Sequence, residues 1–559
     1  MKRDISICGI IGFDWKRLLY LFLVIWVGVN FIQAIFTEVM SDEAYYFLYG
    51  ENLAWGYFDH PPLVGLMTFI SNLFFGGNLS VRFITVVLQF FTLLLVWKII
   101  AEKTPEIGKV VLFFVIAASL VMFQTYGFVT TPDAPFLFFT ALFLFCYKKF
   151  LQEESWHYTF FLAGSMAGMI YSKYHAVLII GFVLLSNLRL LSNYKIWLAG
   201  LLALGLLVPH IYWQITNDFP SFRYHLSDRS SGFRWKYFLE YLPNQLAVFN
   251  PFTFGAIVYI FIKYKPKDIF EKGLYFLTIG FIVFFWITSF RGHVEPHWTV
   301  ACSIPMLVLL YRRSLENKKL LRYVKKVIAP SLFLILLARI LLISGLLPEK
   351  LGFSGKKEKN GIIRSIANEI PVIFTGSFQG ASNYRFFTGK EAFVLSAITG
   401  RQTQFDIWKK ELDYQGKPVF IYRGNNNSPF DGYFAKNFQS VNRIRINFTL
   451  AETEVHPGDT LRISFVMHNP TGQAIDFHHP EFPVKCQAAY KVDERRGKLD
   501  YANCELSAPV DILPAGESIK GYFTTIVPDL APDNYLFSIT LVNSICAARN
   551  SEPVELNID

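Results

Sequence analysis

Charged residues are scarce in this 559-residue chain: they make up 17% of it, whereas a soluble domain carries about 25%. Cysteine is scarcer, with six in the whole chain, which excludes a scaffold built on disulfides. Hydrophobic residues account for 53%, and phenylalanine alone occurs 57 times. Because so much apolar surface needs lipid to cover it, a disordered chain and a wholly soluble fold are both excluded.

Long apolar runs fill the first 347 residues. A membrane-spanning helix needs about 20 mostly apolar residues. Eleven stretches approach that length, at roughly 18–36, 80–97, 109–126, 134–147, 158–172, 174–191, 196–214, 247–262, 273–290, 298–311 and 327–347. Ten runs follow the first, and no small-residue cleavage site is evident, so the first is not expected to be a cleaved signal peptide.

Lysine and arginine fall mainly in alternate loops. With the N-terminus in the cytoplasm, the inner loops hold 22 of them and the outer loops before residue 348 hold seven. Cytoplasmic loops are enriched in these residues, so the N-terminus is predicted to be cytoplasmic and the C-terminus extracytoplasmic. This bias accounts for much of the net charge of +10, and nucleic acid is not expected as a partner.

The composition changes after residue 347. The runs 371–375 (PVIFT) and 418–422 (PVFIY) predict buried strands, and 401–412 between them predicts a helix, which together are typical of a small α/β domain. From about residue 440, strand-like runs alternate with Pro, Gly and Asn turns and favour a β-sandwich. Three domains are therefore expected: 1–347, 348–438 and 439–559.

Polar clusters gather on the predicted outer side of the membrane. They are SDEAYY (41–46), GYFDHPPL (56–63), TTPDAP (130–135), SKYHA (172–176), the loop 215–246 and RGHVEPHW (291–298). Inner loops contain little beyond Lys and Arg. Ionisable residues near a membrane are functional candidates, so the sequence predicts a site at the outer water–lipid boundary.

Asp42 has two interpretations that spacing alone does not separate. Ser41 is a good N-cap, and acids such as Asp42 and Glu43 suit the first turn of a helix. Alternatively, a carboxylate beside a strip of aromatic rings resembles a sugar site. Three tyrosines share a helical face with Asp42 at i+3, i+4 and i+7: Tyr45, Tyr46 and Tyr49.

Other outer residues predict cation or anion binding. Asp59 and His60 could bind phosphate or metal, or form an ordinary loop before a helix. Asp133 is expected chiefly to cap the fourth span, because Pro135 lies in the first turn. Lys173 stands between two apolar segments and must reach the interface or find an anion, for which a phosphate is natural.

His293, Glu295 and His297 alternate, so an extended chain would direct them to one side, where they could bind zinc or a similar ion. A hydrated loop anchored by Trp298 is the favoured alternative. Arg291 adds a cation suited to phosphate. No cofactor is required by the sequence, and a divalent metal is left open, with five candidate ligands: Asp59, His60, His293, Glu295 and His297.

In chain order, DEAYY, YFDHPPL, TPDAP, SKYH and VEPHW resemble the motifs of bacterial membrane glycosyltransferases of the GT-C superfamily. The branch is the one shared by protein O-mannosyltransferases and the aminoarabinose–lipid A transferase. The resemblance covers roughly residues 15–430, including GSFQGASNYRFFTGKEAF and GRQTQFDIW, and leaves 440–559 as an added domain. It implies a GT-C transmembrane catalytic domain, a polyprenyl-phosphate sugar donor and an acceptor outside the cytoplasm.

The resemblance also implies roles for individual residues. The first acid of the DE motif, expected to be the base, is Asp42, and Glu43 matches the second acid. Lys173 matches a lysine near the donor. Asp59 and His60 match a position where the lipid A enzymes carry an acid followed by Lys, and His60 departs from that Lys.

These features predict an inverting glycosyltransferase of the bacterial plasma membrane. Asp42 would deprotonate an acceptor hydroxyl, and nearby cations would stabilise the leaving phosphate. A retaining route would need a second carboxylate as nucleophile. Expected substrate-binding residues are Glu43, Tyr45, Tyr46, Asp59, His60, Asp133, Lys173, His175, Arg229, Arg291, His293, Glu295 and His297.

The sugar and the acceptor stay open, and the acceptor could be protein, lipid A or another glycan. A flippase or transporter of lipid-linked glycans is the alternative class. Transporters place polar residues at the membrane midplane, often in repeated halves. Here the acids lie at loops, and the sequence contains no evident repeat.

Overall fold

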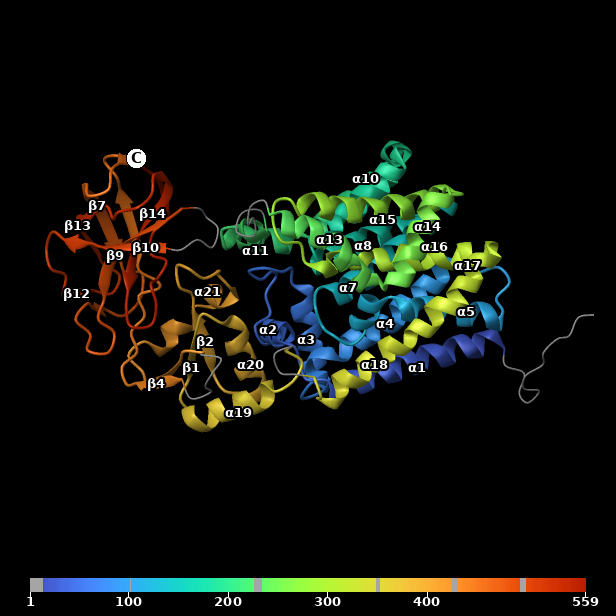
Figure 1. Cartoon of the computed structure of the whole chain (residues 1–559), viewed down its shortest axis with the longest axis horizontal. Coiled ribbons are helices and arrows are strands. Elements are labelled where there is room, and N and C mark those ends of the chain that lie inside the picture. The colour runs from blue at the N-terminus through green and yellow to red at the C-terminus, as the bar shows by residue number, and fades with distance from the viewer. Residues whose placement is uncertain (1–13, 101, 226–233, 348–351, 425–430, 493–498) are drawn as a thin grey trace, which may run out of the picture. The chain divides into compact units, whose positions relative to one another are not determined.

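The computed structural model describes the chain apart from residues 1–13, 101, 226–233, 348–351, 425–430 and 493–498 (Figure 1). It divides into two compact units. The first comprises Met1–Asp218 and Phe233–Ser354, and its described residues are helical. The second comprises Phe219–Gly232 and Gly355–Asp559 and contains the strands.

The helical unit packs its helices around one extensive apolar core. Its helices are α1 (Trp15–Phe36), α2 (Ser41–Glu51), α3 (Leu63–Phe74), α4 (Leu79–Ile100), α5 (Ile107–Ser119), α6 (Val121–Thr125), α7 (Asp133–Gln152), α8 (Trp156–Ser172), α9 (Ala176–Ser186), α10 (Tyr194–Leu206), α11 (Val208–Thr216), α13 (Trp235–Phe249), α14 (Pro251–Lys263), α15 (Ile269–Thr288), α16 (Ser303–Glu316), α17 (Lys318–Tyr323) and α18 (Ala329–Ser344). Short 3₁₀ segments at Leu188–Ser192 and Pro296–Cys302 and a π-helical turn at Val324–Ile328 link some of them.

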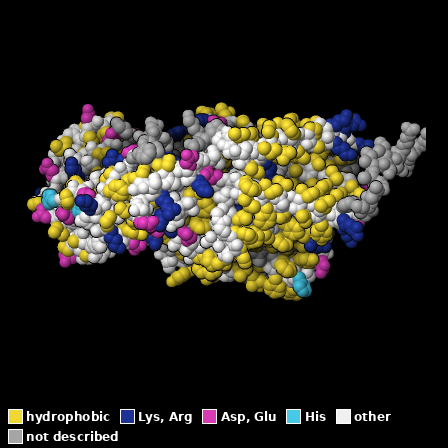
Figure 2. All heavy atoms as spheres, turned by 90° about the horizontal axis from the view of Figure 1, so that it is seen from below, with side chains coloured by type: hydrophobic (Ala, Val, Ile, Leu, Met, Phe, Trp, Pro, Cys, Tyr) yellow, Lys and Arg dark blue, Asp and Glu magenta, His cyan; other side chains and the backbone are white. Residues whose placement is uncertain are grey.

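Among the described residues, five helical segments are long and apolar enough to cross a membrane: Trp15–Phe36, Leu79–Ile100, Asp133–Gln152, Ile269–Thr288 and Lys318–Ser344. Two bent pairs, α10 with α11 and α13 with α14, raise the number to seven if each pair is one span. Several expected spans are shorter helices here, so the count of eleven stays a prediction. Figure 2 shows hydrophobic side chains gathered over the outside of the helical unit, as lipid contact requires.

The sharpest bend, 106° between α13 and α14, is centred on Asn250. This residue has a positive φ of 67°, and its side chain accepts a hydrogen bond from Phe252 N at 3.1 Å. Its amide nitrogen donates to Ser331 Oγ at 2.9 Å. Pro251 lacks a backbone N–H and suits the first turn of the new helix, so the local sequence fixes the bend.

In the second unit, a four-stranded sheet has the order β2-β1-β3-β4. β1 (Val372–Thr375) is parallel to β2 (Ala392–Leu395) and β3 (Val419–Tyr422), and β4 (Gly432–Ala435) is antiparallel to β3. Helices accompany it: α12 (Pro220–Arg223), α19 (Lys356–Ala367), α20 (Phe378–Thr388) and α21 (Gln404–Trp408). The helix expected over 401–412 is interrupted because Lys409 has a φ of 55°, and a 3₁₀ turn follows it.

The remaining strands confirm the expected β-sandwich. One sheet has the order β10-β9-β14-β15-β6 and the other β11-β13-β7-β5, and their inner faces share one apolar core. A short pair, β12 with β8, lies beside them. The strands are β5 (Arg445–Thr449), β6 (Glu454–Val455), β7 (Thr460–His468), β8 (Ile475–Asp476), β9 (Lys485–Lys491), β10 (Leu499–Asn503), β11 (Glu505–Leu506), β12 (Ile512–Leu513), β13 (Ser518–Ile526), β14 (Asp533–Val542) and β15 (Val554–Ile558).

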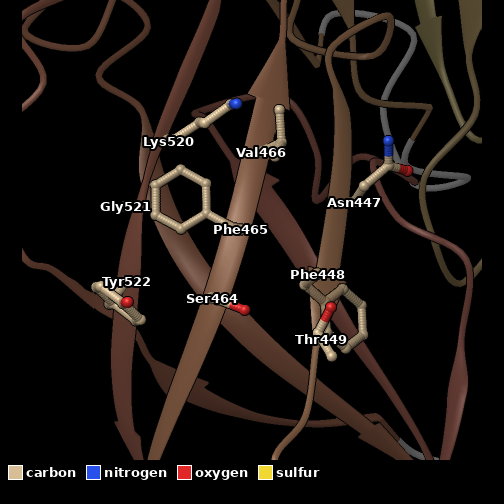
Figure 3. Close-up of a pocket in the computed structure, with 9 residues that line it drawn as sticks. All are labelled: Asn447, Phe448, Thr449, Ser464, Phe465, Val466, Lys520, Gly521 and Tyr522. Atoms are coloured by element: carbon tan, nitrogen blue, oxygen red, sulfur yellow. The ribbon is translucent and has the colours of Figure 1, made fainter.

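A hollow of about 480 Å³ lies over strands β5, β7 and β13 (Figure 3). Gly521 pairs with Phe465 across the two strands, and the Phe465 ring lies against it, since a Cβ at Gly521 would be 3.3 Å from that ring. Lys520, Tyr522 and Asn447 contribute polar groups to its lining. The Arg462 guanidinium lies 4.3 Å from the centre of the Tyr522 ring, so one face of that ring already contacts a cation.

Candidate active site

Helix α2 presents Asp42 to solvent. Met40 is the N-cap of α2, and Ser41 is its first residue rather than the expected cap. The Glu43 carboxylate, three residues after the cap, accepts a hydrogen bond from Met40 N at 2.9 Å. The acid that caps this helix is therefore Glu43, and Asp42 is exposed, which leaves its carboxylate accessible for chemistry.

Glu43 is fully buried against Arg82 of α4, which is also fully buried. Arg82 Nε lies 2.7 Å from Glu43 Oε1, and Nη2 lies 2.5 Å from Oε2. Thr130 N donates to Oε1 at 2.8 Å, and Arg82 Nη1 donates to Thr37 O at 2.6 Å. Glu43, expected to bind substrate, has no exposed surface here; it ties α2 to α1, α4 and the segment before α7.

The tyrosines of α2 do not form the open sugar platform that their spacing suggested. Tyr45 is 1% exposed, Tyr46 7% and Tyr49 0%. The Tyr49 ring stacks on Tyr57, with centroids 3.8 Å apart. The helical face is as predicted, but it packs inward because the loop after α2 folds back over it.

That loop brings Asp59 and His60 to the tyrosines. Tyr49 donates its hydroxyl proton to Asp59 Oδ1 at 2.6 Å, and the Tyr46 hydroxyl lies 3.1 Å from His60 Nε2. Tyr46 lies in α2, outside the candidate spans. Burial, followed by the charges of Asp42, Asp59 and Asp133, raises the pKa of Tyr46 well above its ordinary value. Three of the predicted carboxylates therefore act on one hydroxyl group.

Asp133 and Lys173 form a second buried ion pair. Lys173 Nζ lies 2.6 Å from Asp133 Oδ1, and both side chains are more than nine-tenths buried. Asp133 was expected to cap the fourth span, but Pro132 is the N-cap of α7 and no side chain caps it. The carboxylate is directed to the lysine, and to His297 Nε2 at 3.7 Å. The anion that Lys173 needed is thus supplied by the chain itself.

Of the alternating residues after α15, His293 and Glu295 stay together, and only His297 turns away. His293 Nε2 lies 3.6 Å from Glu295, whereas the 3₁₀ helix that begins at Pro296 carries His297 towards Asp133. In the described part of the chain, no group of three or more His, Cys, Asp or Glu side chains could hold a metal ion. The extended geometry behind the metal hypothesis is therefore not the one observed.

Three other predicted residues have different surroundings. The His175 ring contacts Phe285 and Trp298, with centroids 5.0 and 4.9 Å away. Arg291 is exposed. Arg229 lies outside the described residues.

Two polar groups of this region were missed. Arg82 was counted only as an outer-loop charge, although an arginine inside an apolar run is itself a signal of function or of a buried partner. His210, buried in α11, lies 2.6 Å from Trp55 O through Nδ1 and 3.1 Å from the Tyr174 hydroxyl through Nε2. A histidine in a predicted span carries the same signal.

The helical unit has several helices apolar enough to cross a membrane, and its exposed acid Asp42 lies near two buried ion pairs. Residues 59–213 match the family described as dolichyl-phosphate-mannose-protein mannosyltransferase. The lipid A galacturonosyltransferase RgtD of Rhizobium johnstonii is 24% identical over 294 residues, which are 49% of this chain and 60% of that protein. The match thus spans less than two thirds of the curated relative.

Two crystal structures of ArnT from Cupriavidus metallidurans have the same fold. The apo structure is 14% identical with a TM-score of 0.52, and covers 73% of this chain and 92% of ArnT. The structure bound to undecaprenyl phosphate is 16% identical with a TM-score of 0.51, and covers 73% and 93%. The predicted resemblance to the GT-C branch that includes ArnT is therefore confirmed.

Proposed function

We propose that this protein is an inverting glycosyltransferase that moves a sugar from a polyprenyl-phosphate donor to an extracytoplasmic acceptor. The observation that carries the proposal is the contrast between two neighbouring acids. Asp42 is exposed, whereas the Glu43 carboxylate is buried in an ion pair with Arg82 and accepts hydrogen bonds from backbone amides. A general base must be reachable by its substrate. The ArnT structure with undecaprenyl phosphate supports the donor class.

In the proposed reaction, the Asp42 carboxylate takes the proton of an acceptor hydroxyl. The acceptor oxygen then forms a bond to the anomeric carbon while the bond from that carbon to the phosphate oxygen breaks. The phosphate leaves with the electron pair, and cations stabilise it. The proposed cations are Lys173, which is held in place by Asp133, together with His60 and Arg291.

A single displacement inverts the anomeric centre. The sugar, hexose or pentose, and the acceptor, whether protein, lipid A or another glycan, are left open by this chemistry. The Lys and Arg distribution supports placement in the bacterial inner membrane with a cytoplasmic N-terminus and an extracytoplasmic C-terminus.

A deletion strain tests the proposal for any of these acceptors. Mass spectrometry of its envelope glycoproteins and glycolipids should reveal a species that has lost one sugar. The wild-type gene should restore that species, and Asp42→Asn should not, because a lost general base lowers turnover by about 10²-fold or more.

Asp14→Asn is the matched control. Asp14 is an exposed acid directly before the N-terminus of α1, and α2 follows the opposite end of that helix. This variant should restore the product. Full restoration by Asp42→Asn at wild-type protein level would refute the proposed base, and an unchanged envelope in the deletion strain would refute the transferase.

A further inference from the structure

The hollow over β5, β7 and β13 is a trough on the outer face of its sheet (Figure 3). Alternate residues of β7, among them Phe465, belong to the apolar core of the sandwich. Ser464 and Val466 therefore point to the other face and form the floor of the trough. The strand register gives its walls four side chains: Lys520 and Tyr522 of β13, and Asn447 and Thr449 of β5. Two strand spacings make the trough about 10 Å wide, and it runs along β7.

Three cations lie on this face of the sheet: Arg445 of β5, Arg462 of β7 and Lys520 of β13. All three are exposed, and no carboxylate of the described residues lies at ion-pair distance from any of them. One strand acid shares the face, Glu505 of β11, and two strand spacings separate it from Arg462. The face therefore carries more positive than negative charge, and its cations have no counter-charge from the described chain.

Tyr522 holds the guanidinium of Arg462 in place. The guanidinium carbon lies 4.3 Å from the centre of the ring. A planar guanidinium stacked on a ring keeps its N–H donors available at its edge, where their spacing matches a carboxylate. Two other arginines of the second unit already use that capacity within the chain, since Arg385 pairs with Glu391 and Arg443 with Glu411.

We propose that the trough binds an acidic glycan, with a sugar carboxylate at Arg462 and Lys520 and sugar hydroxyls at Ser464, Thr449 and Asn447. Hydroxyl and amide side chains both donate and accept hydrogen bonds, as the hydroxyl groups of a sugar do. The cations select for negative charge. This binding does not depend on the proposed transferase activity.

The form of the trough favours a glycan over other anions. An acidic peptide could pair with an open strand edge, but both edges of β7 are occupied, by β5 and β13. A phospholipid needs an apolar wall for its acyl chains, whereas these walls are largely polar. A single-stranded nucleic acid needs aromatic faces for its bases, and Arg462 covers one face of Tyr522.

Binding of defined oligomers to the purified full-length protein tests the site. Tetragalacturonate, uncharged maltotetraose and tetraglutamate are titrated separately in the same detergent by isothermal titration calorimetry. Tetragalacturonate should bind about tenfold more tightly than maltotetraose, the effect of one charge-assisted hydrogen bond, and more tightly than tetraglutamate. Its affinity should fall as salt is raised. No binding of tetragalacturonate, equal binding of maltotetraose, or tighter binding of tetraglutamate overturns the proposal.

Arg462→Gln and Lys520→Gln test whether the glycan binds in the trough. Each variant keeps a polar side chain at an exposed strand position and removes one charge. The affinity for tetragalacturonate should therefore fall about tenfold while Tm is unchanged. Lys485→Gln is the matched control, because this exposed lysine lies on β9 of the other sheet, and it should keep the affinity. Wild-type affinity in both trough variants, or an equal loss in Lys485→Gln, would also overturn the proposal.

Discussion

Replacing Glu43 with Gln tests how much the buried pair with Arg82 stabilises the helical unit. The substitution keeps the size of the side chain but leaves a fully buried guanidinium without its counter-charge. Removing one partner of such a pair costs about 3–5 kcal/mol. The new amide nitrogen cannot accept the hydrogen bond from Met40 N, which adds about 1–3 kcal/mol. We expect a total loss of about 4–8 kcal/mol.

Thermal unfolding in detergent is the assay. The entropy of unfolding is about 2.1 cal/mol/K per residue, so in a helical unit of about 340 residues 1 kcal/mol shifts Tm by about 1.4 °C. Glu43→Gln should therefore lower Tm by at least about 5 °C. Asp42→Asn is the matched control: it changes an exposed acid and should leave Tm nearly unchanged while activity is lost. A Glu43→Gln protein that melts with the wild type would refute the structural role given to this pair.

Three further predictions concern other contacts. Lys173→Ala should weaken donor binding or turnover, and Lys173→Arg should rescue it only in part because the two cations differ in shape; unchanged kinetics in both variants against donor concentration would contradict this. Gly50→Ala should cost about 1–3 kcal/mol by overpacking, since its new Cβ would lie 2.5 Å from Thr68 Oγ1, whereas Gly76→Ala, with open space around it, should not change Tm. Arg443→Met should destabilise the second unit by about 3–5 kcal/mol at neutral pH, because it leaves Glu411 buried without its ion-pair partner. Burial already raises the pKa of Glu411, an effect that Arg443 partly opposes. Loss of Arg443 raises that pKa further, so the stability deficit relative to the wild type should be smallest where Glu411 is protonated in both folded proteins, and it should grow as pH rises through the raised folded-state pKa of the wild type. A deficit independent of pH would contradict that assignment.

The membrane character of the chain could be predicted from the sequence, because it depends on a local property, the runs of apolar residues. The two roles left open for Asp42 could not be separated in this way, since the same helix start holds the exposed Asp42 and the fully buried Glu43. The alternation of strand and helix after residue 370 is also local and was confirmed by β1 and β3.

The roles of the neighbouring acids depend on distant partners and could not be predicted in this way. Glu43 meets Arg82 across 39 positions, and Asp133 meets Lys173 across 40. Spacing placed the α2 tyrosines on one face correctly, but only the path of the following loop determines that Tyr57 covers them. The prediction that His293 and His297 point to the same side was wrong for a local reason. Pro296 starts a 3₁₀ helix, which ends the extended geometry before His297.

The separation of the last two domains also depends on contacts that the sequence does not reveal. The boundary near residue 438 between the second and third predicted domains stays a prediction; in the structure, Gly355–Asp559 belong to one compact unit. Gln415 exchanges two hydrogen bonds with the backbone of Ser440, and Ala397 bridges to Ala548. That the β-sandwich can be removed while the α/β part stays folded is still a prediction. The contacts named here favour a loss of stability on truncation.

The Glu43–Arg82 pair has a consequence for the biogenesis of the protein. An arginine at the centre of a spanning helix opposes its insertion by about 2.5–3.5 kcal/mol. Arg82 lies in the first turn of α4, where this penalty is smaller. In the folded protein its guanidinium is fully buried, so it must pair with Glu43 before it is desolvated. The partner acid precedes it by 39 residues and is therefore synthesised first. We expect α2 to stay at the membrane surface until α4 has been synthesised. The two helices then insert together and pack against α1 as one unit without net charge at the Glu43–Arg82 pair.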